Sequence, residues 1–68
     1  MLIKKSINMA YPKFVIKKSS NDKYYFNLHA VNSQIIATSE MYETKVGCKN
    51  GIQSVKSNAP NAEIDDQS

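Results

Sequence analysis

The chain has 68 residues, one cysteine, nine lysines without any arginine, six acidic residues and a net charge of +3. Its length suffices for one domain, and a lone cysteine excludes the small secreted scaffolds held by internal disulfides. A structural zinc site is disfavoured as well, because Cys48 and His29 are the only thiol and imidazole side chains, whereas tetrahedral zinc takes four ligands.

The short length raises the question of what stabilises the fold. A domain of this size buries only about 60% of the surface that its unfolded chain exposes, and such chains usually rely on disulfides, metals or a second subunit. By elimination, we expect a homodimer. No apolar run reaches the ~20 residues of a membrane-spanning helix, and residues 1–8 lack the apolar core of a signal peptide. Together with the free thiol, this predicts a cytoplasmic protein.

Two segments with a period of two predict the first strands. The first segment follows Pro12, a residue suited to the entry of a strand, and the second, residues 23–30, has the clearest alternation in the chain. The alternation predicts that one face of these strands is buried and that the other is an exposed sheet face. The residues predicted on the exposed face are Lys17, Tyr25, Asn27 and His29.

A third short strand is expected over residues 34–38, after a hairpin at Asn32 and Ser33. A two-residue turn of type I′ requires positive φ at both central positions, which favours glycine where Ser33 stands. The connection is therefore expected to be longer than two residues.

The period changes to that of a helix after Tyr42, with an apolar stripe that includes Cys48. Thr44 is suited to cap the start of this helix, and Pro60 is expected to stop it by Asn58. Gly51 lies beside the stripe and costs about 1 kcal/mol relative to alanine within a helix. A close approach of the helix to the sheet at Gly51 would offset that cost.

These elements predict an α+β fold, in which one helix packs on one face of a three-stranded antiparallel sheet. Residues 61–68 are expected to form either an acidic tail or a short fourth strand at the edge. An unpaired edge is a site for a partner's strand, so dimerisation is expected to complete the sheet. The predicted core consists of Phe14, Ile16, Tyr24, Phe26, Leu28, Cys48, Ile52 and Val55.

Four runs of sequence, residues 24–30, 32–36, 38–42 and 50–60, carry a family resemblance. Their motifs are Phe-x-Leu-x-Ala, Asn-x-Gln, Thr-Ser-Glu-x-Tyr and, on the expected helix, Asn-Gly-Ile-x-Ser-Val. The chain resembles the YegP-like family of small bacterial proteins in these motifs, which together span most of its length. Ser33 departs from the pattern, because family members usually have glycine there.

The resemblance implies a unit of three antiparallel strands followed by a helix, here over residues 11–60. Residues 1–8 precede what looks like the usual start of the family at Met9, and we expect an N-terminal extension over residues 1–10 to be flexible. Many members carry two tandem copies of the unit, whereas this chain carries one, so the resemblance implies pairing of two chains about a two-fold axis. It implies no established activity.

The sequence predicts no catalytic, cofactor-binding or metal-binding residue. His29 has no identifiable partners for acid–base or nucleophilic catalysis, and Cys48 is expected to serve core packing. Glu40 and Tyr42 lie at the junction between strand and helix, where ligand recognition is one interpretation. We favour a structural one, in which Glu40 complements the helix dipole and Tyr42 covers the edge of the core.

The leading hypothesis is a non-enzymatic protein that acts by association, first with itself and then with a protein partner not identified by the sequence, through its exposed sheet edge. The alternative is a weak nucleic-acid-binding module that uses the lysine-rich N-terminal half and Tyr25, although the chain lacks the glycine-containing signature of an RNA recognition motif. A small enzyme would require a pocket shared by two of His29, Tyr42 and Cys48.

Overall fold

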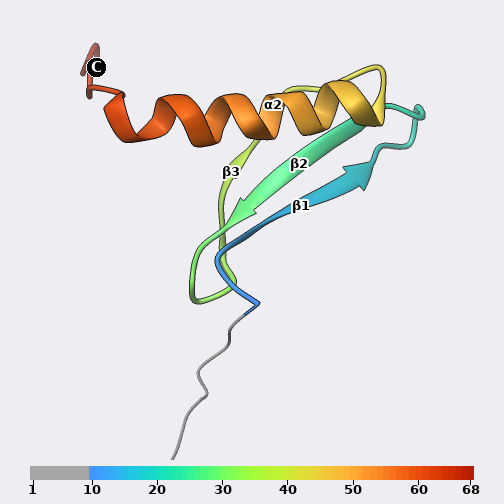
Figure 1. The fold of residues 1–68 in the computed structure, drawn as a ribbon, viewed down its shortest axis with the longest axis horizontal. Helices are drawn as coiled ribbons and strands as arrows, with labels where there is room; N and C mark the ends of the chain where they lie inside the picture. Colours follow the sequence, from blue (N-terminus) through green and yellow to red (C-terminus); the bar gives the residue numbers. More distant parts are fainter. Residues whose placement is uncertain (1–9) are drawn as a thin grey trace, which may run out of the picture.

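The computed structural model describes residues 10–68, and its helix and strands follow one another in the order that the sequence predicts (Figure 1). The α+β class and the antiparallel arrangement are confirmed, with the strand order β1-β2-β3. The expectation of a flexible extension concerns residues 1–10, of which residues 1–9 lie outside the described residues. The elements are β1 (Lys13–Lys18), β2 (Tyr24–His29), β3 (Ile35–Thr38), α2 (Lys45–Asn58) and the 3-10 turn η1 (Ala59–Asn61).

The C-terminal tail does not join the sheet. Residues 62–68 form neither helix nor strand, and Ile64 is 96% exposed. The short fourth strand, one of the two alternatives for this segment, is therefore absent, and the acidic tail lies in solvent.

The sheet is built on β2. Phe14 pairs with Leu28 and Ile16 with Phe26 in the antiparallel register of β1 with β2, so these four side chains share one face. On its other side β2 pairs with β3, with an irregularity in register between Leu28 and His29. After β3 the chain returns to β2, where Tyr24 and Tyr42 exchange backbone hydrogen bonds of 2.8 and 2.7 Å. The return holds the entry to α2 against the sheet.

Both ends of α2 lie where the sequence predicts them. The hydroxyl of Thr44 accepts a hydrogen bond of 2.9 Å from the backbone N–H of Gly47, which caps the helix. The helix ends at Asn58, and Pro60 lies in the turn that follows. In Figure 1, the C-terminal end of α2 extends past the sheet.

The core lies between α2 and the sheet and is small. Its buried apolar residues are Phe26, Cys48 and Ile52, of which Cys48 is completely buried. Leu28 is half-buried and lies outside this cluster, so its predicted place in the core is wrong. The partly buried side chains packed around the cluster are Phe14, Ile16, Tyr24, Tyr42 and Val55.

The two β-hairpins close in the same way. In the second, the N–H of Ala30 donates to the carbonyl of Gln34 and the N–H of Ser33 donates to the carbonyl of Ala30. Ser33 has a φ of 71°, and the loop has three residues, longer than two as expected. In the first hairpin, Ser19 pairs with Lys23 and Asp22 takes the left-handed position with a φ of 65°.

The left-handed residues provide a matched pair of stability tests. We expect Ser33→Gly to raise the free energy of unfolding by about 0.5–1 kcal/mol, because glycine avoids the left-handed penalty of about 1–2 kcal/mol but loses more entropy on folding. Asp22→Gly should raise the free energy of unfolding by less, because aspartate tolerates the left-handed region better than serine does. Urea unfolding of both variants would measure the difference, and an equal gain at the two positions would contradict the argument.

Candidate interaction surfaces

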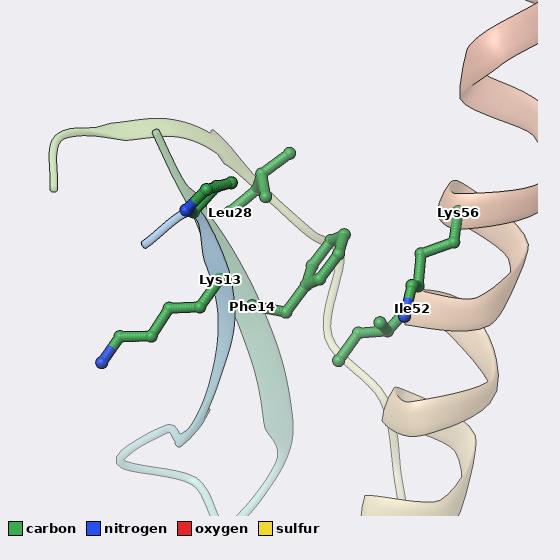
Figure 2. A pocket seen from close by; sticks show the side chains of 6 residues that line it. Lys13, Phe14, Leu28, Ile52 and Lys56 are labelled. Atoms are coloured by element: carbon green, nitrogen blue, oxygen red, sulfur yellow. The ribbon is translucent and has the colours of Figure 1, made fainter. Parts of the chain in front are cut away.

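A groove of about 500 Å³ opens between the sheet and α2 (Figure 2). Figure 2 shows Phe14 of β1 and Ile52 of α2 pointing toward each other across it. In Figure 1, α2 begins near the start of β2, and the helix and the strand diverge toward the other end of β2. The groove is lined by Pro12, Lys13, Phe14, Leu28, Ile52 and Lys56.

The groove does not bring together the residues that an enzyme hypothesis requires. None of His29, Tyr42 and Cys48 lines it. Its walls are mainly aliphatic and aromatic, which suits the burial of apolar side chains from a partner.

The edge strand β3 is exposed along its whole length. Ile35 and Ile36 are 54% and 63% exposed, and Val31 in the preceding loop is 66% exposed. Since β3 is the last strand of the sheet, the outer side of its backbone has no strand partner within residues 10–68. Unpaired backbone groups beside apolar side chains are the features through which a sheet edge recruits another strand.

The predicted exposed sheet face is only partly exposed. Lys17 is exposed, and Tyr25 and His29 are half-buried. The prediction for Asn27 is wrong, because this residue is 7% exposed. Asn27 lies in β2 opposite Thr38 of β3, whose hydroxyl donates a hydrogen bond of 2.8 Å to the amide oxygen of Asn27. On its other side, Asn27 pairs with Val15 of β1.

Glu40 and Tyr42, the two polar residues at the junction between strand and helix, differ in burial. Glu40 is exposed and precedes the first turn of α2, and its backbone carbonyl accepts a hydrogen bond from the Ser39 hydroxyl. Tyr42 packs on the core, with its ring stacked on Phe26 at a centroid distance of 6.3 Å. The Tyr42 ring also lies directly against Gly51, so it connects the sheet to the helix.

Cys48 faces the interior and is not positioned as a nucleophile. Burial raises the pKa of its thiol, which keeps the thiol protonated at neutral pH, whereas a reactive cysteine requires a thiolate. Within residues 10–68, no three side chains of histidine, cysteine, aspartate or glutamate gather as a metal site would require.

Two contributors to these surfaces are not among the residues predicted from the sequence. Tyr11 lies beside the sheet, with its ring centroid 5.7 Å from that of His29. The alternation of β1 does not extend to Tyr11, because the strand begins at Lys13. The second contributor is the exposed pair Ile35 and Ile36, which the sequence does signal, since adjacent residues of one strand point to opposite faces and a single helix covers only one face.

Comparison with known proteins assigns the chain to a family. Residues 19–66 match the family model described as a domain of unknown function, DUF1508. The chain belongs to this YegP-like family. It is 52% identical over 52 residues to the UPF0339 protein YegP of Yersinia pestis, an alignment that covers 76% of this chain and 46% of that protein. The chain therefore spans about half the length of the first curated relatives that it matches.

Other relatives have nearly the length of this domain. A UPF0339 protein of Methanosarcina acetivorans is 54% identical over 52 residues, which are 76% of this chain and 90% of the relative. A solution NMR structure of a Haloferax volcanii protein matches with a TM-score of 0.73 at 38% identity, covering 79% of this chain and 92% of the other. Since both organisms are archaea, the family is not confined to bacteria. The relatives carry no description of activity.

Proposed function

We propose that this YegP-like chain is a non-enzymatic protein that acts by self-association through β3 and the groove beside α2, and then by binding a protein partner. The observation that carries the proposal is the imbalance of apolar surface. The buried core contains three hydrophobic residues, whereas six large hydrophobic side chains are at least half exposed in residues 10–68. The six are Val31, Ile35, Ile36, Met41, Val46 and Ile64.

The location of these side chains favours the β3 edge as the centre of the interface. Val31, Ile35 and Ile36 gather on or beside β3, and a pairing of two β3 edges would satisfy backbone groups as well as cover apolar side chains. Such an isologous contact generates a closed dimer about a two-fold axis. The groove lined by Phe14 and Leu28 offers further apolar area on each chain.

The lengths of the relatives support the same proposal. The aligned part of this chain covers only 46% of the Yersinia pestis protein, so that polypeptide has room for a second unit of this size. A relative of which this chain covers 90% does not have that room, and under this proposal its second unit would come from another chain. None of the helical segments within residues 10–68 has the length and hydropathy of a membrane span. As a separate part of the proposal, we place the protein in a reducing cytoplasm, which suits the free thiol of Cys48.

Sedimentation velocity and native mass spectrometry test the proposal at micromolar concentration. The wild-type chain should have twice the monomer mass, and it should keep that mass at high salt because the interface is apolar. The variant carrying both Ile35→Lys and Ile36→Lys should be monomeric. Val46→Lys is the matched control, since Val46 is 68% exposed but lies on α2, and this variant should remain dimeric.

Two outcomes would contradict self-association. One is a monomeric wild-type chain at these concentrations. The other is an equal loss of dimer in the β3 variant and the Val46→Lys control, which would place the contact elsewhere or attribute the loss to charge alone.

A further inference from the structure

The face of the sheet that points away from α2 combines aromatic and basic side chains. In β1, Lys13 and Lys17 alternate with the residues of the core, and their register partners in β2 are His29 and Tyr25. Figure 2 shows the side chain of Lys13 pointing away from α2, whereas Phe14 points toward it. We call Tyr11, Lys13, Lys17, Tyr25 and His29 the basic–aromatic face.

One end of this face is held in a defined geometry. The Nδ1 of His29 lies 2.8 Å from the carbonyl oxygen of Ser33, which requires a proton on Nδ1 and leaves Nε2 for other contacts. The Tyr11 ring lies 5.7 Å from the His29 ring, tilted by 49°. The Nζ of Lys13 lies 4.6 Å from the centroid of the Tyr11 ring. Two ring systems and one ammonium group therefore meet here.

The other end consists of the cross-strand pair Lys17 and Tyr25. Tyr25 precedes His29 by four residues on β2, which separates the two ends by about 13 Å. Val15, Asn27 and Thr38 lie between them and carry no charge. The face thus has two aromatic platforms, each beside a lysine.

The charges of this face are not neutralised locally. The three strands contain no acidic residue. Lys18 pairs with Asp22 and Lys23 with Glu43, both outside the basic–aromatic face. Within the described part of the chain, neither Lys13 nor Lys17 forms an ion pair. A surface of this kind attracts anions.

We propose that the basic–aromatic face binds single-stranded nucleic acid. Bases would stack on the rings at the two ends, and phosphates would lie near Lys13 and Lys17, which is the general design of single-strand-binding surfaces. The chain has no arginine for bidentate recognition of guanine, so binding should be weakly dependent on base sequence. The face lies on the side of the sheet away from α2, and of its five residues Lys13 also lines the rim of the groove. The proposal does not rest on self-association.

Fluorescence anisotropy with a labelled oligothymidylate of about twelve nucleotides, at about 50 mM salt, tests the proposal. Tyr25→Leu should weaken binding about 5- to 150-fold, the range for loss of one stacked base. Lys17→Gln should reduce the slope of affinity against salt, on logarithmic axes, by about 0.7. Lys49→Gln is the matched control, because Lys49 is an exposed lysine on α2 and should change neither quantity.

Three results would overturn the proposal. The first is no binding of the single strand by the wild-type chain. The second is binding that Tyr25→Leu leaves unchanged while Lys17→Gln and Lys49→Gln weaken it equally, since that pattern indicates adsorption by net charge. The third is equal affinity for a duplex of the same length, whose bases are not available for stacking on protein side chains.

Discussion

Gly51→Ala should lower the free energy of unfolding by about 1–3 kcal/mol, the usual cost of overpacking, although alanine is favoured over glycine in a helix by about 1 kcal/mol. A Cβ atom at this position would overlap the hydroxyl oxygen of Tyr42 and would lie 2.6 Å from its Cζ. The Tyr42 ring cannot move aside freely, because it stacks on Phe26 and because the backbone of Tyr42 is hydrogen-bonded to that of Tyr24. Urea unfolding at a fixed protein concentration measures the change.

A double-mutant cycle separates this clash from other effects of the methyl group. In a Tyr42→Leu background, Gly51→Ala should become stabilising by up to about 1 kcal/mol, as helix propensity dictates. Gly47→Ala is the control within the same helix, since its Cβ would be 3.8 Å from the Tyr42 ring and 3.2 Å from the Thr44 hydroxyl. Gly47→Ala should destabilise the chain less than Gly51→Ala, because its nearest contact is with the Thr44 hydroxyl rather than with an overlapping aromatic ring. If Gly51→Ala stabilises the wild-type chain as well, the contact with Tyr42 does not constrain the helix.

The contact between Gly51 and Tyr42 illustrates which parts of the fold can be predicted from the sequence and which cannot. Periodicity and caps predict the strands, the helix and both helix ends, because these depend on neighbours along the chain. The sequence also predicts a close approach at Gly51. It does not identify Tyr42 as the approaching group, because the return of the chain to Tyr24 is a contact between distant residues.

The wrong predictions for Asn27 and Leu28 also arise because contacts between residues distant in the sequence decide their burial. Asn27 was expected on an exposed face from the alternation of β2 alone, but its burial depends on Thr38 of the neighbouring strand. Leu28 belongs to the apolar face of β2, but α2 does not pass over it closely and the groove opens there. Neither the two-residue alternation of a strand nor the apolar stripe of a helix encodes the direction in which the helix crosses the sheet. The exposure of Ile35 and Ile36, and hence the candidate interface, depends on that direction too.

Phe26→Ala should remove most of the stability of the fold. Large-to-small changes of buried phenylalanine cost about 3–5 kcal/mol, which is about what a core of this size supplies. Phe26 is 4% exposed and is the central ring of three. It meets Phe14 edge-on at 5.6 Å and 75°, and Tyr42 nearly parallel at 6.3 Å and 17°. Loss of near-UV circular dichroism and collapse of amide dispersion would report the unfolding.

The milder Phe26→Leu variant keeps the prediction measurable, because it should leave a folded chain. It retains an apolar side chain but loses two aromatic contacts of about 0.5–1.5 kcal/mol each, so we expect a loss of about 1–3 kcal/mol in urea unfolding. Tyr25→Leu is the matched control on the same strand, since Tyr25 lies on the opposite face and is half-buried. It should change stability by less than about 1 kcal/mol. Equal losses of unfolding free energy in the two variants would mean that strand propensity determines the effect. The ring cluster of Phe14, Phe26 and Tyr42 would then not be the centre of stability.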